Sequence, residues 1–146
     1  MDNIIGSTDF RMQHFSIREL MLRMGDNQLI ANRVQSKIWD EQKQVRFIES
    51  VLCGIPIASL YFNGSTPQWS VLDGVERLCA IEAFVNNEFA LNGLELLYPK
   101  YENKFFNDFP PAVRRRLMNT SVFGYVLTRE LPQGILNSIF KRLNGD

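Results

Sequence analysis

The sequence has few of the residues on which the commonest metal and nucleophile sites depend. It contains a single histidine, His14, and two cysteines, Cys53 and Cys79. Zinc sites of the HExxH type, HNH-type nuclease sites and Ser-His-Asp triads all need more histidines or differently placed ones. Acid–base chemistry in this chain would therefore depend on Asp, Glu and Arg, and we expect His14 to be a surface or structural residue.

The low cysteine content also excludes a disulfide framework. Cys53 and Cys79 lie far apart, each in an apolar stretch, and no CxxC motif occurs. This pattern is typical of buried free thiols in a reducing compartment. The expected location is therefore the cytoplasm.

Long apolar runs and net charge are missing as well. No apolar run approaches the ~18 residues that a membrane span needs, and residues 1–10 lack the apolar centre of a signal peptide. Sixteen Lys and Arg residues balance sixteen Asp and Glu residues. Long-range attraction to nucleic acid or membrane is not expected, and any such binding needs a local patch of charge.

What the sequence does contain fits one ordinary domain spanning residues 1–146, with residues 1–14 as a loose lead-in, since 45% of its residues are apolar. Apolar spacing predicts helices at 16–25, 40–53, 75–86, 109–119 and 132–143. β-Branched and aromatic runs predict strands at 29–30, 55–62, 68–73 and 121–130, and a short extended piece at 88–96. This mixture predicts an α/β or α+β fold with a small mixed sheet flanked by helices.

Local signals mark several helix ends. Ser16 and Glu19 fit a capping box, in which each side chain bonds the other residue's backbone N–H. Asp40 is a favourable N-cap for the next helix, and Gly54 fits its C-terminal stop. Asn144 is expected to cap the last helix.

The stretch VLDGVER, residues 71–77, raises the main functional question. It predicts a strand that ends at Asp73, with Leu72 on the opposite face, followed by a turn at Gly74 and a helix. Arg77 then lies in the first turn of that helix, where the helix dipole disfavours a cation by up to ~1 kcal/mol. The amides of Gly74 and the side chain of Arg77 suit a phosphate, and Asp73 suits Mg²⁺, usually bound through water. The alternative is an ordinary ion pair of Arg77 with Asp73 or Glu76, worth under ~1 kcal/mol on a surface.

Several blocks of the chain, in the same order, resemble a ParB/sulfiredoxin-like domain family. The blocks are IWDEQKQVRFIESVLCGIPIASLYF, WSVLDGVERLCAIEAFV, FNDFPPAVRRRLMN and IFKRLNG, and the resemblance runs from about Phe15 to the C-terminus. Members of that family carry a DGQQR motif and form the N-terminal part of GmrSD-type modification-dependent restriction and phage-defence proteins.

The resemblance implies a function for the DGVER turn. In the family, the DGQQR loop is associated with binding and hydrolysis of a nucleoside triphosphate, with Mg²⁺ as a cofactor, in support of DNA restriction by an appended nuclease domain. Asp73, Gly74 and Arg77 match that motif. The resemblance therefore implies that Gly74 and Arg77 hold phosphates and that Asp73 or Glu76 manages the metal or water.

The chain departs from the family pattern in three ways. Val75 and Glu76 replace both glutamines, so hydrolysis is expected to be weakened or lost. The family's aromatic-Gln-Arg tripeptide has only Arg33 or Gln35, in RVQSKIW, as stand-ins. The sequence ends at RLNGD without a nuclease signature, where relatives continue. The alternative is therefore a non-catalytic DNA- or protein-binding module that regulates or inhibits a partner protein in a defence or anti-defence setting.

Other basic residues are candidates for nucleic-acid contact. Arg114, Arg115 and Arg116 form the only basic run, but three successive helical residues spread around most of the helix circumference. We expect this run to form a solvated face, with phosphate contact by Arg114 and Arg115 as the alternative. Lys43, with Lys37 and Arg46, flanks the start of the second helix near Trp39. We expect Trp39 to anchor the core or its rim, with stacking on a base as the alternative.

Overall fold

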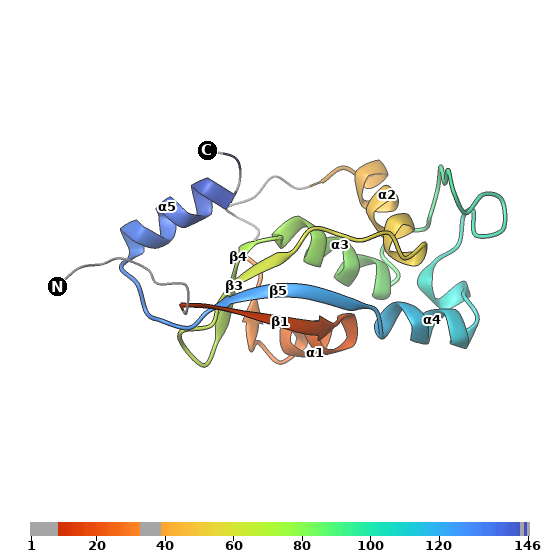
Figure 1. Cartoon of the computed structure of the whole chain (residues 1–146). Coiled ribbons are helices and arrows are strands. Elements are labelled where there is room, and N and C mark those ends of the chain that lie inside the picture. The colour runs from red at the N-terminus through yellow and green to blue at the C-terminus, as the bar shows by residue number, and fades with distance from the viewer. Residues whose placement is uncertain (1–8, 33–38, 144, 146) are drawn as a thin grey trace.

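The computed structural model describes residues 9–32, 39–143 and 145, and within these residues the chain forms an α/β fold (Figure 1). The sheet runs in the order β1-β5-β3-β4-β2. Its strands are β1 Phe10–Ser16, β2 Leu29–Ile30, β3 Leu60–Asn63, β4 Trp69–Asp73 and β5 Ser121–Leu127. The helices are α1 Ile17–Gly25, α2 Glu41–Leu52, α3 Val75–Val85, α4 Pro111–Met118 and α5 Gln133–Leu143, with a 3₁₀ turn at Phe106–Asp108. The expected mixed sheet flanked by helices is confirmed.

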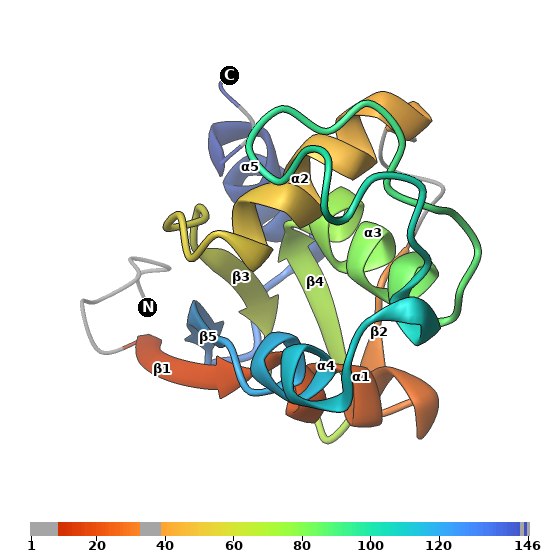
Figure 2. The same ribbon diagram turned by 90° about the vertical axis from the view of Figure 1, so that its right-hand side faces the viewer.

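The sheet is mixed because antiparallel and parallel pairs alternate across it. β1 pairs antiparallel with β5, and β3 pairs antiparallel with β4. β3 lies parallel to β5, and β2 lies parallel to β4. β5 is the next strand after β4 in the sequence. Between these two strands the chain forms α3, a long segment and α4 (Figure 2).

The predicted N-caps at Ser16 and Asp40 are present, whereas the Glu19 carboxylate of the predicted capping box is bound by Arg23. The Oγ of Ser16 accepts a hydrogen bond from the backbone N–H of Glu19 at 3.0 Å. The carboxylate of Asp40 accepts from the N–H of Lys43 at 2.8 Å, and α2 ends before Gly54, whose φ is +74°. These local bonds explain why the helix starts could be located from the sequence alone.

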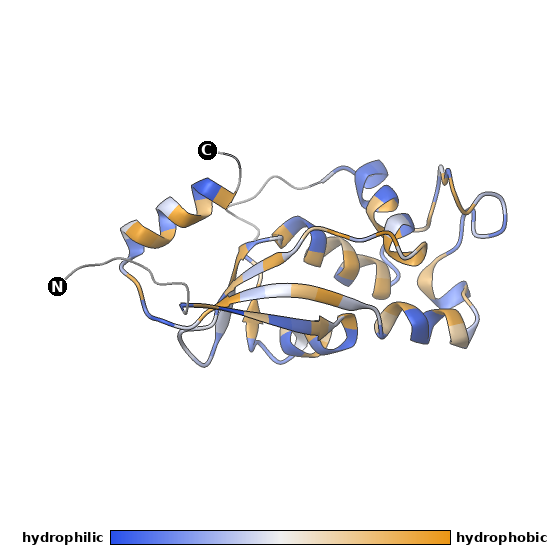
Figure 3. Ribbon diagram, viewed as in Figure 1, coloured by the Kyte–Doolittle hydropathy of each residue, from blue (hydrophilic) through white to orange (hydrophobic). Residues whose placement is uncertain are grey.

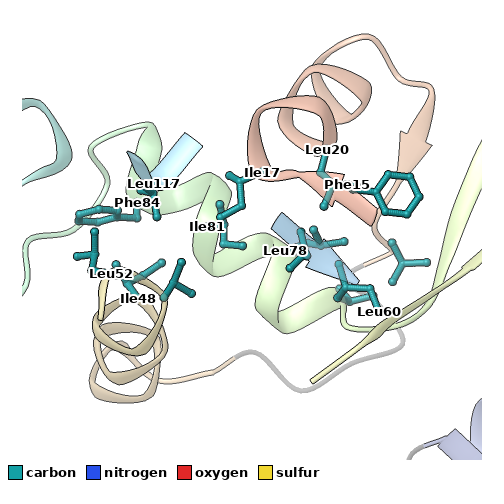
Figure 4. Packing of buried hydrophobic residues seen from close by; sticks show 14 of the residues in the cluster. Phe15, Ile17, Leu20, Ile48, Leu52, Leu60, Leu78, Ile81, Phe84 and Leu117 are labelled. Carbon is teal, nitrogen blue, oxygen red and sulfur yellow. The ribbon is translucent and has the colours of Figure 1, made fainter. Parts of the chain in front are cut away.

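The two faces of the sheet are covered by different helices. One buried cluster joins the sheet to α1, α2, α3 and α4 (Figure 4). It includes Leu60 and Phe62 of β3, whereas Tyr61 between them packs in the smaller cluster beneath α5. Every residue of α5 keeps some exposure, and hydrophobic and hydrophilic residues alternate along it (Figure 3). None of the helices in the described part of the chain has the length and hydropathy of a membrane span.

Three expected element boundaries are wrong. Residues 10–14 belong to β1 and pair with β5, so the lead-in does not extend to residue 14. Residues 55–59 are not a strand, because Pro56 has no N–H to donate and the carbonyls of Ala58 and Ser59 bond to a side chain instead. The strand expected to run to residue 130 ends at Leu127.

Two further expectations are corrected. The segment 88–96 forms no strand, since part of its backbone binds carboxylates instead of a neighbouring strand. Cys53 is exposed because it caps the C-terminus of α2, and only Cys79 is partly buried. Burial nevertheless raises the pKa of the Cys53 thiol, with Glu49 adding to the effect and Arg116 opposing it.

Candidate functional site

The Asp73–Arg77 turn has the predicted order of strand, glycine and helix. Two features of the structure each require a glycine at position 74. Gly74 is the N-cap of α3 and has φ +112°, a conformation that side chains other than glycine rarely adopt. A Cβ at this position would lie 2.3 Å from Cδ2 of Leu60. The glycine therefore allows β4 to pass directly into α3 while β3 packs closely against the turn.

Arg77 turns into the protein. Its guanidinium donates hydrogen bonds to the backbone carbonyls of Ala58 and of Ser59, the latter at 3.1 Å, and to the carboxylate of Asp73 at 3.1 Å. Only 14% of its side chain is exposed. Arg77 thus ties the segment before β3 to the start of α3, and the carboxylate of Asp73 offsets the unfavourable position of a cation in the first helical turn.

Side chains were expected to alternate between the two faces of the sheet along all of β4, but this alternation is interrupted before Asp73. Asp73 is the register partner of Tyr61 while Val71 is the partner of Phe62, so Leu72 is an additional residue between two pairs. In such a bulge two successive residues oppose one residue of the partner strand. Asp73 is consequently beside Tyr61, and not on the face of Val71.

This neighbourhood perturbs two ionisable groups. Burial raises the pKa of the Asp73 carboxyl, an effect that Arg77 opposes and Glu76 reinforces. Burial also raises the pKa of the Tyr61 phenol, and Tyr125 and Asp73 raise it further. The Tyr61 and Tyr125 rings are stacked, with centroids 4.9 Å apart. The environment disfavours further negative charge.

The residues at the turn do not fit the expected Mg²⁺. Asp73 already binds Arg77, and Glu76 is the only other carboxylate of the motif. Within residues 9–32, 39–143 and 145, no group of three or more His, Cys, Asp or Glu residues is arranged to hold a metal ion. Magnesium prefers several oxygen ligands in octahedral geometry.

Convergent backbone amides, expected at the Gly74 turn, occur in another part of the chain. The Glu49 carboxylate accepts hydrogen bonds from the N–H groups of Glu95, Leu96 and Leu97 at 3.0, 2.6 and 2.9 Å. Glu49 is only 4% exposed. The oxyanion held by these amides is therefore the protein's own, and it anchors the loop between α3 and α4.

A second group of charged residues lies where α1 meets α4. A hollow of about 280 Å³ is lined by Arg18, Arg114 and Arg115 together with Phe106, Pro111 and Met118. We call it the arginine hollow. Arg18 donates to the side-chain oxygen of Asn119 at 3.4 Å, and none of the three arginines forms an ion pair with a carboxylate of the described residues.

The structure separates the members of the basic run and adds a residue that the sequence did not indicate. Arg114 and Arg115 line the arginine hollow, whereas Arg116 lines a smaller hollow of about 100 Å³ beside Gly54. Arg18 joins the first two only because α1 packs against α4. No local pattern in the sequence connects these distant positions, so Arg18 could not be found by motif.

The remaining candidates lie elsewhere. The Lys43 ammonium lies 5.1 Å from the centre of the Trp39 ring, and that ring meets Phe47 edge-on at 5.5 Å, so Trp39 anchors the rim of the core. His14 is exposed, with its Nδ1 3.3 Å from the Ser121 hydroxyl oxygen, as expected of a surface residue. Arg33, Gln35, Lys37 and Asn144 lie outside the described residues.

Comparisons of the chain with protein-family models, with curated proteins and with solved structures find no match.

Proposed function

We propose that this domain binds the phosphate backbone of nucleic acid through the arginine hollow. The observation that carries the proposal is the convergence of Arg18, Arg114 and Arg115 on one hollow without a carboxylate partner among the described residues. Unpaired guanidinium groups have several N–H donors in a planar fork, which suits phosphate oxygens.

The charge distribution favours a local contact over general attraction. Because the chain has a formal net charge of zero, a distant polyanion experiences little overall pull. The three arginines supply a local positive charge, and none of the six residues lining the hollow is acidic. We therefore expect weak binding that is independent of base sequence and sensitive to salt.

The resemblance to restriction and phage-defence proteins supports DNA as the target. In such a system a domain of this kind would hold DNA for a partner protein or an appended nuclease domain. The proposal concerns binding and assigns no reaction to this chain.

Hydrolysis of a nucleoside triphosphate at the DGVER turn remains a second prediction, and it has a structural requirement. Arg77 would have to exchange the carbonyls of Ala58 and Ser59 and the carboxylate of Asp73 for phosphate oxygens. Phosphate release from a nucleoside triphosphate with Mg²⁺, measured for the wild type and for Arg77→Ala, tests this prediction. A rate equal to the buffer blank for both proteins would remove it.

Binding through the arginine hollow is tested with a fluorescent DNA duplex and anisotropy at low ionic strength. We expect Arg115→Ala to weaken binding about tenfold, since a hydrogen bond to a charged group contributes about 1.5 kcal/mol or more. Arg116→Ala is the matched control because Arg116 is the next residue of the same helix but lines a different hollow. Equal losses for the two variants, or no loss for either, would contradict the proposal.

A further inference from the structure

A larger hollow lies on the other side of the molecule, between α5 and the sheet. Its volume is about 570 Å³, within the range of pockets that hold small ligands. The helices α4 and α5 lie at opposite ends of the sheet (Figure 1), so this hollow is separate from the arginine hollow. We call it the α5 hollow.

Its polar lining is fixed by hydrogen bonds that leave donors available. The side-chain oxygen of Asn63 accepts from the backbone N–H and the hydroxyl of Ser65, at 3.1 and 2.7 Å. Because a backbone N–H can only donate, the Asn63 oxygen must face Ser65 and its NH₂ group is left for another partner. On α5, the side-chain oxygen of Asn137 accepts from the amide of Gln133 at 2.9 Å, which leaves the pair three N–H donors and the carbonyl oxygen of Gln133.

The charge of the lining favours an anion. Lys141 is the one ionisable group among the described residues that line the α5 hollow, and it is exposed. A ligand with an oxyanion could bind Lys141 while its other acceptors take hydrogen bonds from Asn63 or Asn137. A cationic ligand would find no carboxylate among the described residues that line the hollow.

Part of the lining is apolar, and Asn32 and Ser70 add further polar groups. Leu72 of β4 and Leu136 and Phe140 of α5 contribute to it. Leu72 and Leu136 belong to the small cluster that holds α5 on the sheet, so the hollow is bounded by packed side chains on that side. Apolar walls with a few placed polar groups are typical of sites for small organic ligands.

We propose that the α5 hollow binds a small organic anion with a planar, carbonyl-bearing ring, of the size and chemistry of a pyrimidine nucleoside monophosphate. The ring lies against Leu72, Leu136 and Phe140, and its carbonyl oxygens accept from the amides of Asn63 and Asn137. The oxyanion binds Lys141. This site is independent of the arginine hollow and of the proposed nucleic-acid binding.

The experiment uses the complete chain and uridine 5′-monophosphate as the probe, followed by chemical-shift changes in ¹H–¹⁵N spectra. Saturable shifts centred on α5 and β4 are expected. Asn63→Asp keeps the acceptor for Ser65 but replaces the free NH₂ with a carboxylate oxygen, so it should raise the dissociation constant at least about tenfold. Lys141→Met changes an exposed side chain and should do the same, whereas the equally exposed Arg142→Met should leave the constant within about twofold of wild type.

Inorganic phosphate and uridine are titrated separately, and each should bind at least about tenfold more weakly than the monophosphate, since each lacks one part of the contact. The proposal is overturned if millimolar monophosphate shifts no residue of α5 or β4. It is also overturned if phosphate or uridine alone binds equally well, or if Arg142→Met weakens binding as much as Lys141→Met. Loss of binding in Arg115→Ala would place the probe in the arginine hollow and would likewise contradict it.

Discussion

The Asp73–Arg77 turn and the arginine hollow both gather charged side chains, but they use them differently. At the turn, the guanidinium of Arg77 is mostly buried and binds the protein's own carbonyls and carboxylate. In the arginine hollow, the guanidinium groups of Arg114 and Arg115 have no such partners among the described carboxylates. A short motif can thus identify charged residues without showing whether they stabilise the fold or remain available to a ligand.

Substitutions in the two regions should have opposite effects. Changes at the turn should lower stability and leave binding of DNA intact in the folded protein. Changes in the arginine hollow should lower binding and leave stability within about 0.5 kcal/mol, as is usual for exposed surface positions. A variant that reverses this pattern would break the distinction between the two regions.

The largest effect on stability is expected for Gly74→Val. The substitution forces a β-branched residue to adopt φ +112° and places its Cβ against Leu60. Positive φ and overpacking each cost about 1–3 kcal/mol, so the free energy of unfolding should fall by about 3–5 kcal/mol in urea denaturation. Gly134→Ala is the control, since no atom lies within 4 Å of the added Cβ and its φ is not positive. A neutral Gly74→Val would show that the turn is looser than described.

Arg77→Met should be the next most damaging change. It keeps an apolar stem but removes the hydrogen bonds to the carbonyls of Ala58 and Ser59 and leaves Asp73 without its cation. The loss is expected to be about 2–3 kcal/mol, because hydrogen bonds to charged groups contribute more than neutral ones. Unfolding in urea measures it, and DNA anisotropy on the same protein should be unchanged. Reduced DNA binding with full stability would assign Arg77 to a ligand site.

Glu49→Gln tests a second charged side chain that, like Arg77, is bound by the protein's own groups. One oxygen, Oε2, accepts from the N–H groups of Glu95, Leu96 and Leu97, and the amide oxygen of glutamine can take its place only without the negative charge. We expect a loss of about 2 kcal/mol, because hydrogen bonds to charged groups contribute more than neutral ones. Hydrogen exchange should become faster in residues 95–97 before the rest of the chain. Unchanged protection there would contradict the role of Glu49 as an anchor.

The smallest effect is expected in the pH dependence of stability at Asp73. Burial raises its pKa above the ordinary 3.8, with Arg77 opposing this effect. A carboxyl with a raised folded-state pKa contributes stability that is present at acidic pH and is lost as the pH rises through that pKa. The stability of the wild type relative to Asp73→Asn should therefore decline as the pH rises above about 3.8. Urea unfolding across this range measures it. A relative stability that increases with pH would show that the Arg77 ion pair outweighs burial.

Much of the fold could be predicted because local signals specify it. The caps at Ser16 and Asp40, the glycine at the start of α3 and the ion pair of Arg77 with Asp73 all involve residues close together in the sequence. The spacing of apolar residues also predicted the positions of the five α-helices along the chain. Such features depend on short-range geometry that residue type largely determines.

The rest depends on contacts between distant parts of the chain. Nothing local shows that Arg77 reaches the carbonyl of Ser59, that Glu49 holds residues 95–97, or that Arg18 joins Arg115. The bulge at Leu72 arises from the pairing of β3 with β4 and moves Asp73 beside Tyr61. For these reasons the order of strand, glycine and helix at the turn could be predicted, whereas the hydrogen bonds of Arg77 to the segment before β3 could not.

The most direct test of the distinction between the two regions is the salt dependence of DNA binding. Each phosphate contact contributes about −0.9 to the slope of log K against log salt concentration. Arg115→Ala should make the slope less negative by about one, and Arg77→Met should leave it at the wild-type value. A slope that changes with Arg77→Met and stays constant with Arg115→Ala would contradict the account.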